Sequence, residues 1–155
     1  MSKKEQAALE SAIEMLSKQH DDVDDMFGDY KKLMDLEAPA SKRKALADKI
    51  CQALSDHAKL EETIFYPAAR EALDKDAEDI MDHADVEHAT LKGLIERIST
   101  SNGEDPHFDA LVHVLAEYVK HHVEEEEDEM FSELRKAEAD MGDVVNKMKA
   151  FKPKG

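Results

Sequence analysis

Apolar residues recur at steps of three and four positions in four successive stretches of this chain. Such steps place apolar side chains on one face of an α-helix, and that face has to be buried against other helices. The apolar positions are, in chain order, Leu9, Ile13, Leu16, Val23, Phe27, Tyr30 and Met34; Ile50, Leu54, Ile64 or Phe65, and Ala68; Met81, Ala84, Leu91, Ile95 and Ile98; and Leu111, Leu115, Tyr118, Met130 and Leu134. The pattern therefore predicts four long amphipathic helices that pack together.

Residues typical of turns separate the four stretches. Residues 37–41 contain a proline and end in Ser41, which we expect to cap the second helix, and residues 101–106 include Asn, Gly and Pro. A weaker break lies around residues 73–76, and Pro67 should kink the second helix or bring it close to its end. We predict helices at about 3–36, 42–72, 77–100 and 107–138, and a short tail helix within 139–155. Short connections favour an all-α, antiparallel, up-down-up-down four-helix bundle that forms one domain over residues 1–155.

The composition agrees with this fold class and limits the partners. Glycine (5 of 155 residues) and aromatic residues (5%) are scarce, which disfavours β-sandwiches and glycine-rich nucleotide-binding folds. A net charge of −16 argues against nucleic acid or an anionic membrane surface as the partner. The single cysteine, Cys51, lies in an apolar stretch and is expected to be buried. No apolar run approaches the roughly 20 residues of a membrane span, so we expect a cytoplasmic protein.

Each of the four apolar faces is interrupted near its middle by a histidine. These residues are His20, His57, His88 and His122. In the second and fourth helices a glutamate follows one turn later, at Glu61 and Glu126. Burying ionisable groups in a core is costly unless they are paired or bound to a metal ion. Because a cluster of all six would destabilise the bundle without a cation, we predict that these six residues bind metal.

The His-x3-Glu spacing has a chemical consequence. It places both side chains on one helix face, with Cβ atoms about 5–6 Å apart, so that one ion can contact both. Two such motifs can supply two carboxylates that bridge two ions, with two imidazoles on each ion. Nitrogen and oxygen ligands suit two iron ions, with manganese or zinc as substitutes. Two histidines, two bridging glutamates and an oxo or hydroxo bridge leave an open position on each iron.

The two halves of the chain resemble each other. Residues 57–66 and 122–131 share the pattern H-x3-E-E-x2-Φ-Φ, in which Φ is apolar or aromatic. The lone histidines of the first and third helices precede these motifs by 37 and 34 residues. The halves are therefore predicted to be related by approximate two-fold symmetry, as a symmetric dinuclear site requires.

The order H…HxxxE…H…HxxxE, with the stretches HAKLEETIFYP and VEHATLKGLIERI, resembles the hemerythrin-like (HHE cation-binding) domain family over about residues 9–135. The resemblance implies a four-helix bundle with a non-haem di-iron centre, in which Glu61 and Glu126 match the bridging carboxylates. Oxygen-carrying hemerythrins have five histidines and a His-x3-His pair in the third helix, where this chain has Ala84 and Lys92 around His88. Their fourth-helix carboxylate is an Asp at +5, whereas this chain has a Glu at +4. The chain is closer to the four-His, two-Glu branch, which includes proteins linked to nitrosative stress and iron–sulfur centre repair and the sensor domain of an iron-regulated ubiquitin ligase.

Several other residues compete for a place in the site. His121 has the same spacing to a glutamate as its neighbour, but the apolar face favours position 122. Glu87 is an alternative ligand or an acceptor for an imidazole N–H group, whereas His83 is expected at the surface. Tyr118 lies one turn before position 122 and could donate a hydrogen bond to a metal-bound oxygen species, whereas Tyr66 is assigned to the core or its rim.

Three functions fit this pattern. The first is a di-iron protein that binds or reacts with O₂, NO or peroxide in an oxygen or redox-stress response, either as a binder or as an enzyme. The second is an iron store or an iron donor for the repair of iron–sulfur centres. The third is a metal-stabilised structural or interaction domain. We favour the first because each iron keeps an open position, and the pattern does not specify an oligomeric state.

Overall fold

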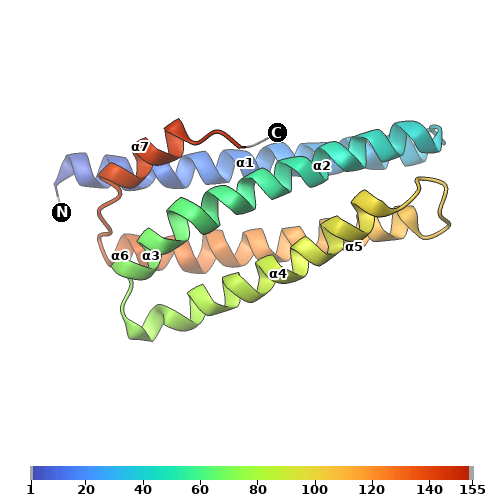
Figure 1. The fold of residues 1–155 in the computed structure, drawn as a ribbon. Coiled ribbons are helices and arrows are strands. Elements are labelled where there is room, and N and C mark those ends of the chain that lie inside the picture. Colours follow the sequence, from blue (N-terminus) through green and yellow to red (C-terminus); the bar gives the residue numbers. More distant parts are fainter. Residues whose placement is uncertain (1, 154–155) are drawn as a thin grey trace.

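The computed structural model describes residues 2–153, and the regular elements in that range are all helical (Figure 1). The longest are α1 (Lys3–Asp35), α2 (Ala40–Leu60), α4 (Glu78–Thr100) and α5 (Phe108–Glu125). They lie side by side along one common direction (Figure 1). The predicted all-α class is confirmed, and the architecture is a helical bundle.

Two of these helices continue through a turn of π-helix. After α2, the π turn η1 (Glu61–Phe65) leads into α3 (Tyr66–Ala72). After α5, the π turn η3 (Glu126–Met130) leads into α6 (Phe131–Lys136). The residues at these joints keep right-handed helical dihedral angles, so the helix path is not broken. The π turns begin at equivalent positions of the two halves, and the sequence pattern did not predict them.

The connections differ from the expected ones in two details. The backbone of Leu73 is extended and ends α3, and a short 3₁₀ turn, η2 (Lys75–Ala77), leads into α4. The helix α2 begins before Ser41, so the expectation that this serine caps it is wrong. Pro39 is the capping residue instead, because its extended backbone directs its carbonyl to the N–H groups of residues 42 and 43.

The C-terminal segment folds back onto the bundle. Glu138 has a left-handed backbone (φ 52°), and the N–H of Ala139 donates to the carbonyl of Leu134, which together end α6 in a Schellman-type turn. The short helix α7 (Gly142–Ala150) follows and packs against α1 and η1. Its buried residues Val145 and Met148 close this end of the core.

The buried apolar residues form two clusters. One contains Leu9, Leu16 and Phe131 and includes the side chains of α3, α6 and α7. The other contains Ile50 and Leu115 and fills the part of the bundle near the α1–α2 and α4–α5 connections. Along each long helical path, the histidine of the apolar face stands between residues of the first cluster and residues of the second. The polar layer therefore divides the hydrophobic core in two.

Polar contacts fix the end of the bundle near the α1–α2 connection. Arg43 on α2 donates from Nη1 to both oxygens of Asp109 on α5, at 2.6 and 2.7 Å. Tyr30 on α1 donates to the same carboxylate at 2.6 Å. Three helices are thus joined at a single carboxylate.

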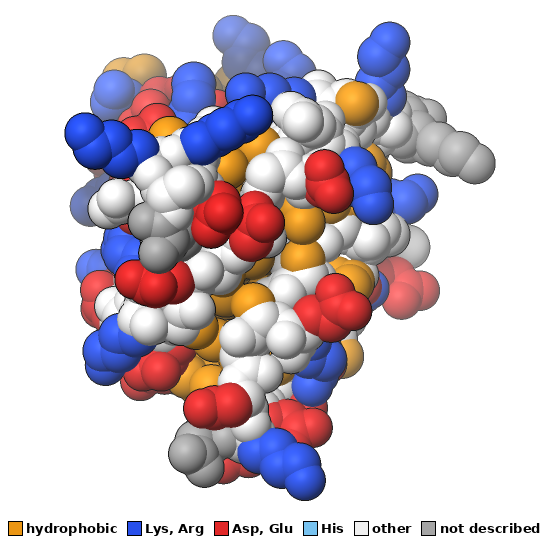
Figure 2. All heavy atoms as spheres, turned by 90° about the vertical axis from the view of Figure 1, so that its left-hand side faces the viewer, with side chains coloured by type: hydrophobic (Ala, Val, Ile, Leu, Met, Phe, Trp, Pro, Cys, Tyr) orange, Lys and Arg blue, Asp and Glu red, His pale blue; other side chains and the backbone are white. Residues whose placement is uncertain are grey.

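The opposite end of the molecule presents acidic and basic side chains interspersed, with apolar side chains visible between them (Figure 2). This face belongs to the end at which α1 begins and α3 and α6 end. The acidity of the chain is therefore not concentrated in one patch on this face.

We predict that truncating a core residue of the second cluster destabilises the protein, whereas truncating its exposed neighbour does not. Leu115 is 1% exposed and Val114 is 48% exposed. Leu115→Ala should lower the free energy of unfolding by about 2–5 kcal/mol, because it leaves a cavity. Val114→Ala should change it by less than about 0.5 kcal/mol. Urea denaturation of the metal-free variants measures both, and equal effects would contradict this assignment of the core.

Candidate metal centre

The four histidines predicted to bind metal meet in the middle of the bundle. They come from four different helices: His20 from α1, His57 from α2, His88 from α4 and His122 from α5. Each side chain is at most 9% exposed. The Nε2 atoms form two close pairs, His20 with His57 and His88 with His122, each at 3.2 Å. The pairing joins the two helices of each half of the chain.

The two predicted glutamates lie between these histidine pairs. Each is the first residue of a π turn, and both carboxylates are fully buried. Glu61 Oε1 is 3.1 Å from the Nε2 atoms of both His57 and His88. Glu126 is 3.5 Å from His122 Nε2 and 3.2 Å from His20 Nε2. Each carboxylate thus faces one histidine of its own half and one of the other half, as a bridging ligand must.

The other ring nitrogen of each histidine donates a hydrogen bond to a side chain outside the cluster. The Nδ1 donors and their acceptors are His20 to Glu127 (2.7 Å), His57 to Gln19 (2.6 Å), His88 to Glu62 (3.0 Å) and His122 to Glu87 (2.9 Å). An acceptor at Nδ1 places the proton there and leaves the Nε2 lone pair directed into the cluster. All four imidazoles are therefore oriented as metal ligands.

These contacts follow the repeat in the sequence. Glu62 and Glu127 each follow a buried carboxylate and reach the lone histidine of the other half. Gln19 and Glu87 each precede a lone histidine and reach the His-x3-Glu histidine of their own half. The approximate two-fold relation predicted from the sequence thus extends to the hydrogen bonds around the cluster, with one difference, an amide in one half where the other has a carboxylate.

The donor set fits a pair of metal ions. Within the described range, Glu61 Oε2 and Glu126 Oε1 are buried without a regular hydrogen bond. Glu126 Oε1 lies 3.2 Å from His20 Nε2, which can donate to it only when His20 is protonated. The paired Nε2 atoms direct their lone pairs at each other, an arrangement that is unfavourable unless a proton or a cation lies between them. Two overlapping groups of four ligands result: His20 and His57, or His88 and His122, each with both glutamates. Both groups offer the nitrogen and oxygen donors that iron, manganese or zinc accept.

In the metal-free protein, protons take part of the place of the cations. Burial lowers the pKa of His20, but hydrogen bonds and charges from Glu126 and its neighbours outweigh it and raise that pKa to about 9. Burial lowers the pKa of His57 to about 3, so this imidazole is neutral and can accept from its partner. The pKa of His122 is raised to about 9 by the same effects, with Glu126 again the main contributor. Burial, together with the adjacent carboxylate of Glu126, raises the pKa of Glu61 to about 8.

Tyr66 reaches the centre of the cluster, although the sequence assigned it to the core. Its hydroxyl lies 2.5 Å from Glu126 Oε2 and 3.2 Å from both Glu61 Oε1 and His88 Nε2. In an α-helix a residue five positions after Glu61 points about 140° away from it. The π turn removes this offset, because the N–H of Tyr66 donates to the carbonyl of Glu61 and closes a five-residue turn. Pro67 directly after Tyr66 was the signal of irregular helix geometry at this point.

The structure also decides between the competing residues. His122 lies in the cluster, whereas His121 is 61% exposed. Glu87 is buried, and its Oε1 accepts from Nδ1 of His122, so it holds a ligand from outside the cluster. His83 is exposed, as expected. Tyr118 is half-buried and packs against the second apolar cluster.

Comparison with protein families gives a match that covers most of the chain. The model of the hemerythrin HHE cation-binding domain matches residues 11–134. This chain belongs to the hemerythrin HHE cation-binding domain family. The six His and Glu residues of the cluster, and the buried Glu87 beside them, lie within the matched range. Comparisons with curated proteins and with solved structures find no match.

Membership in this family makes the chain a metal-binding domain of hemerythrin type, and the buried cluster is the part of the structure able to hold the ions. No helix within residues 2–153 has both the length and the hydrophobicity to cross a membrane. The fifth histidine of oxygen-carrying hemerythrins has no counterpart on α4, because Ala84 and Lys92 occupy the positions one turn from His88. The Tyr66 hydroxyl instead lies at hydrogen-bonding distance from that histidine.

We predict that loading with metal releases protons at neutral pH. At pH 7 the metal-free cluster holds protons on His20, His122 and Glu61, whose pKa values are about 9, about 9 and about 8. Metal ions compete with these protons, so the affinity should fall as the pH falls below 9. Calorimetric titration with Zn²⁺ in buffers of different ionisation enthalpy should show more than one proton released per chain at pH 7, and fewer above pH 9. Binding without proton release at pH 7 would contradict these protonation states.

We predict that the Tyr66 hydroxyl stabilises the metal-free protein more than the metal-loaded protein. Tyr66→Phe leaves a buried carboxylate oxygen without its donor, which costs about 1–3 kcal/mol when no cation replaces it. A bound ion contacts the same carboxylate, so the loss should be smaller in the loaded protein. The control is Tyr118→Phe, which alters a half-buried tyrosine away from the cluster. Urea denaturation with and without metal measures the four values, and equal losses in both states would exclude this role.

Proposed function

We propose that this protein holds two iron ions in the cluster and uses them to bind or react with O₂, NO or peroxide. The iron pair would be held by His20, His57, His88 and His122, with Glu61 and Glu126 bridging. In this proposal, α2 with η1 and α3 acts as one long helix, and α5 with η3 and α6 acts as another. The bundle is then the up-down-up-down four-helix arrangement that the sequence predicts.

The observation that carries this proposal is the orientation of the four imidazoles. All four Nδ1 groups are engaged by acceptors outside the cluster, and all four Nε2 atoms face inward in two pairs. Two bridging carboxylates with unsatisfied oxygens lie between the pairs. A single ion would leave a proton alone to compensate the other pair of imidazoles, so the geometry favours two ions.

The number of protein ligands supports a reactive rather than a purely structural centre. Each metal position has four donor atoms, two nitrogens and two oxygens. Four donors close a tetrahedral zinc site but leave positions open on a six-coordinate iron. Iron at such a site supplies redox chemistry and an open position for a small ligand. The buried surroundings suit diatomic molecules or peroxide rather than a large substrate.

The residues of this chain have distinct parts in the proposed chemistry. The four acceptors of the Nδ1–H groups hold the imidazoles in one tautomer; they are Glu127, Gln19, Glu62 and Glu87. Tyr66 places a hydroxyl among the ligands, where it can donate a hydrogen bond to a carboxylate or to a bound small molecule. The two apolar clusters exclude bulk water from both ends of the centre.

We predict that the purified protein contains about two iron ions per chain and shows a ligand-to-iron charge-transfer band in the near ultraviolet. His122→Ala or Glu61→Ala should abolish the band and lower the iron content, because each removes a ligand from the centre of the cluster. The control is His107→Ala, which removes an imidazole that is 88% exposed. Metal analysis and absorption spectroscopy measure both quantities. Zinc as the sole metal after growth with iron available, or an iron band unchanged in His122→Ala, would refute the proposal.

The same iron-loaded protein distinguishes the three functions that the sequence favoured. It is reduced with dithionite and then exposed separately to O₂, NO and H₂O₂ while spectra are recorded. A reversible spectral change indicates binding, and rapid loss of peroxide indicates turnover. Release of iron on reduction indicates a store or donor, and an unresponsive centre indicates a structural domain.

A further inference from the structure

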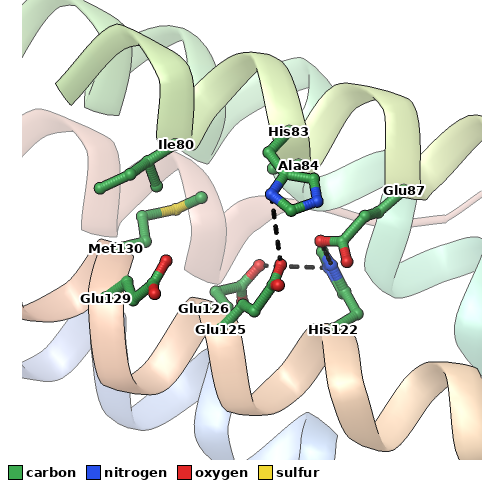
Figure 3. A pocket seen from close by; sticks show the side chains of 9 residues that line it. All are labelled: Ile80, His83, Ala84, Glu87, His122, Glu125, Glu126, Glu129 and Met130. Carbon is green, nitrogen blue, oxygen red and sulfur yellow. Dashed lines mark hydrogen bonds and ion pairs between the residues drawn. The ribbon is translucent and has the colours of Figure 1, made fainter.

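A second group of possible ligands lies outside the cluster, between α4 and α5. His83 and Glu87 are one turn apart on α4, and His121 and Glu125 are one turn apart on α5. Each pair thus repeats the His-x3-Glu spacing of the inner ligands. Figure 3 shows His83, Glu87 and Glu125 directed toward one space between the two helices. The imidazoles of His83 and His121 are 57% and 61% exposed, so this group can be reached from solvent.

One contact in this outer group, His121 Nε2 to Glu125 Oε1 at 2.9 Å, is within hydrogen-bonding range, whereas two others are longer. His83 Nδ1 is 3.7 Å from Glu125 Oε2, and His121 Nε2 is 3.9 Å from Glu87 Oε2, both beyond hydrogen-bonding range. Ligand atoms of His83, Glu87 and Glu125 lie within 4.8 Å of one another. Two atoms that each lie about 2.1 Å from one ion are roughly 3–4 Å apart. Small side-chain movements would therefore place these atoms around a single ion.

Glu87 supplies the buried carboxylate of the outer group. Its side chain is 5% exposed, and its Oε1 accepts from His122 Nδ1 at 2.9 Å. The ion pair of Oε2 with His121 is a long one, at 3.9 Å. The carboxylates of Glu87 and Glu125 also face each other, and burial and the charge of Glu87 raise the pKa of Glu125. A cation between the two carboxylates would offset this repulsion.

The outer group is not a by-product of the internal repeat. The two halves of the sequence can be aligned so that His88 matches His20 and His122 matches His57. The four positions of the outer group then correspond to Met15, Gln19, Asp56 and Leu60 in the first half. These residues include no imidazole and a single carboxylate, and Leu60 is part of the apolar core. The outer group is therefore a feature of the α4–α5 side alone.

The outer group opens onto the inner cluster. A small cleft is lined by His83, Glu87 and Glu125 and also by the inner ligands His122 and Glu126 (Figure 3). The cleft has a volume of about 10 Å³, which is room for about one water molecule or ion. We propose that His83, Glu87, His121 and Glu125 form an outer site for one divalent cation, through which ions pass to the inner cluster. This passage rests on the inner cluster holding metal, as proposed above, whereas the outer site itself does not.

The test uses Co²⁺, which is coloured and stable to air in such sites. The full chain is freed of metal and titrated with Co²⁺ in the wild type, in His83→Gln and in a control, His113→Gln. The control removes an exposed imidazole that forms the same contact with a glutamate one turn later, His113 Nε2 to Glu117 Oε1 at 2.9 Å, as His121 forms with Glu125. We expect three ions per chain in the wild type and in His113→Gln, and two in His83→Gln. Stopped-flow absorbance at low Co²⁺ should show the two inner ions binding several-fold more slowly in His83→Gln, with the same final amplitude.

Each outcome decides a separate point. Two ions in the wild type, three in His83→Gln, or an equal loss in His113→Gln would overturn the outer site. Equal loading rates in wild type and His83→Gln would overturn the passage of ions through it. One ion in the wild type and none in His83→Gln would uphold the outer site and refute the inner di-metal centre. Because His83 is exposed, its replacement should leave folding intact, and His121→Gln provides a second variant with the same expected stoichiometry.

Discussion

The fold of this protein depends on how the charge in its centre is compensated. The six His and Glu side chains of the cluster are buried with Glu87 beside them. Each uncompensated charge there would cost several kcal/mol, out of a total stability that is typically only about 5–15 kcal/mol. The hydrogen bonds to the Nδ1 atoms satisfy only the outward side of each imidazole. The inward side consists of facing nitrogen lone pairs and carboxylate oxygens that need a cation or a proton. The two apolar clusters can close over this layer only when that need is met, so metal binding and packing are two parts of one requirement.

The sequence was sufficient to predict the helices and the cluster, because both follow from one periodic pattern. An apolar face that is interrupted at one level in four helices brings the interrupting residues together whatever the details of the connections. His20, His57, His88 and His122 meet for this reason, and each His-x3-Glu spacing adds a carboxylate on the same face. The side chains that accept hydrogen bonds from the imidazole N–H groups were harder to predict from the sequence. Glu87 was considered, but Gln19, Glu62 and Glu127 stand beside ligands in a chain rich in acidic residues, and spacing alone does not separate them from exposed neighbours.

The details that the sequence missed arise where the helices leave the α-helical period. A π turn adds one residue to a turn, so a pattern counted at 3.6 residues per turn misplaces some side chains beyond it, even though Met130 and Leu134 are buried as the pattern predicts. Tyr66 was assigned to the core for this reason, although its hydroxyl meets two carboxylates and an imidazole. The equivalent position in the second half, after the second π turn, is Phe131, which packs in the core without a hydroxyl. The same backbone feature therefore places a hydroxyl group in the cluster in one half and an apolar ring in the core in the other half.

The two histidine pairs consequently have unequal surroundings, although the helices that carry them follow the same repeat. On the His88–His122 side, Glu87 provides a buried carboxylate where the other side has the amide of Gln19. A carboxylate acceptor makes an imidazole a stronger electron donor than an amide does. The Tyr66 hydroxyl lies on this same side, at hydrogen-bonding distance from His88 Nε2. These two differences distinguish the His88–His122 side of the cluster from the His20–His57 side. An ion held by His88 and His122 would have the stronger nitrogen donors and a hydroxyl group close to its ligands.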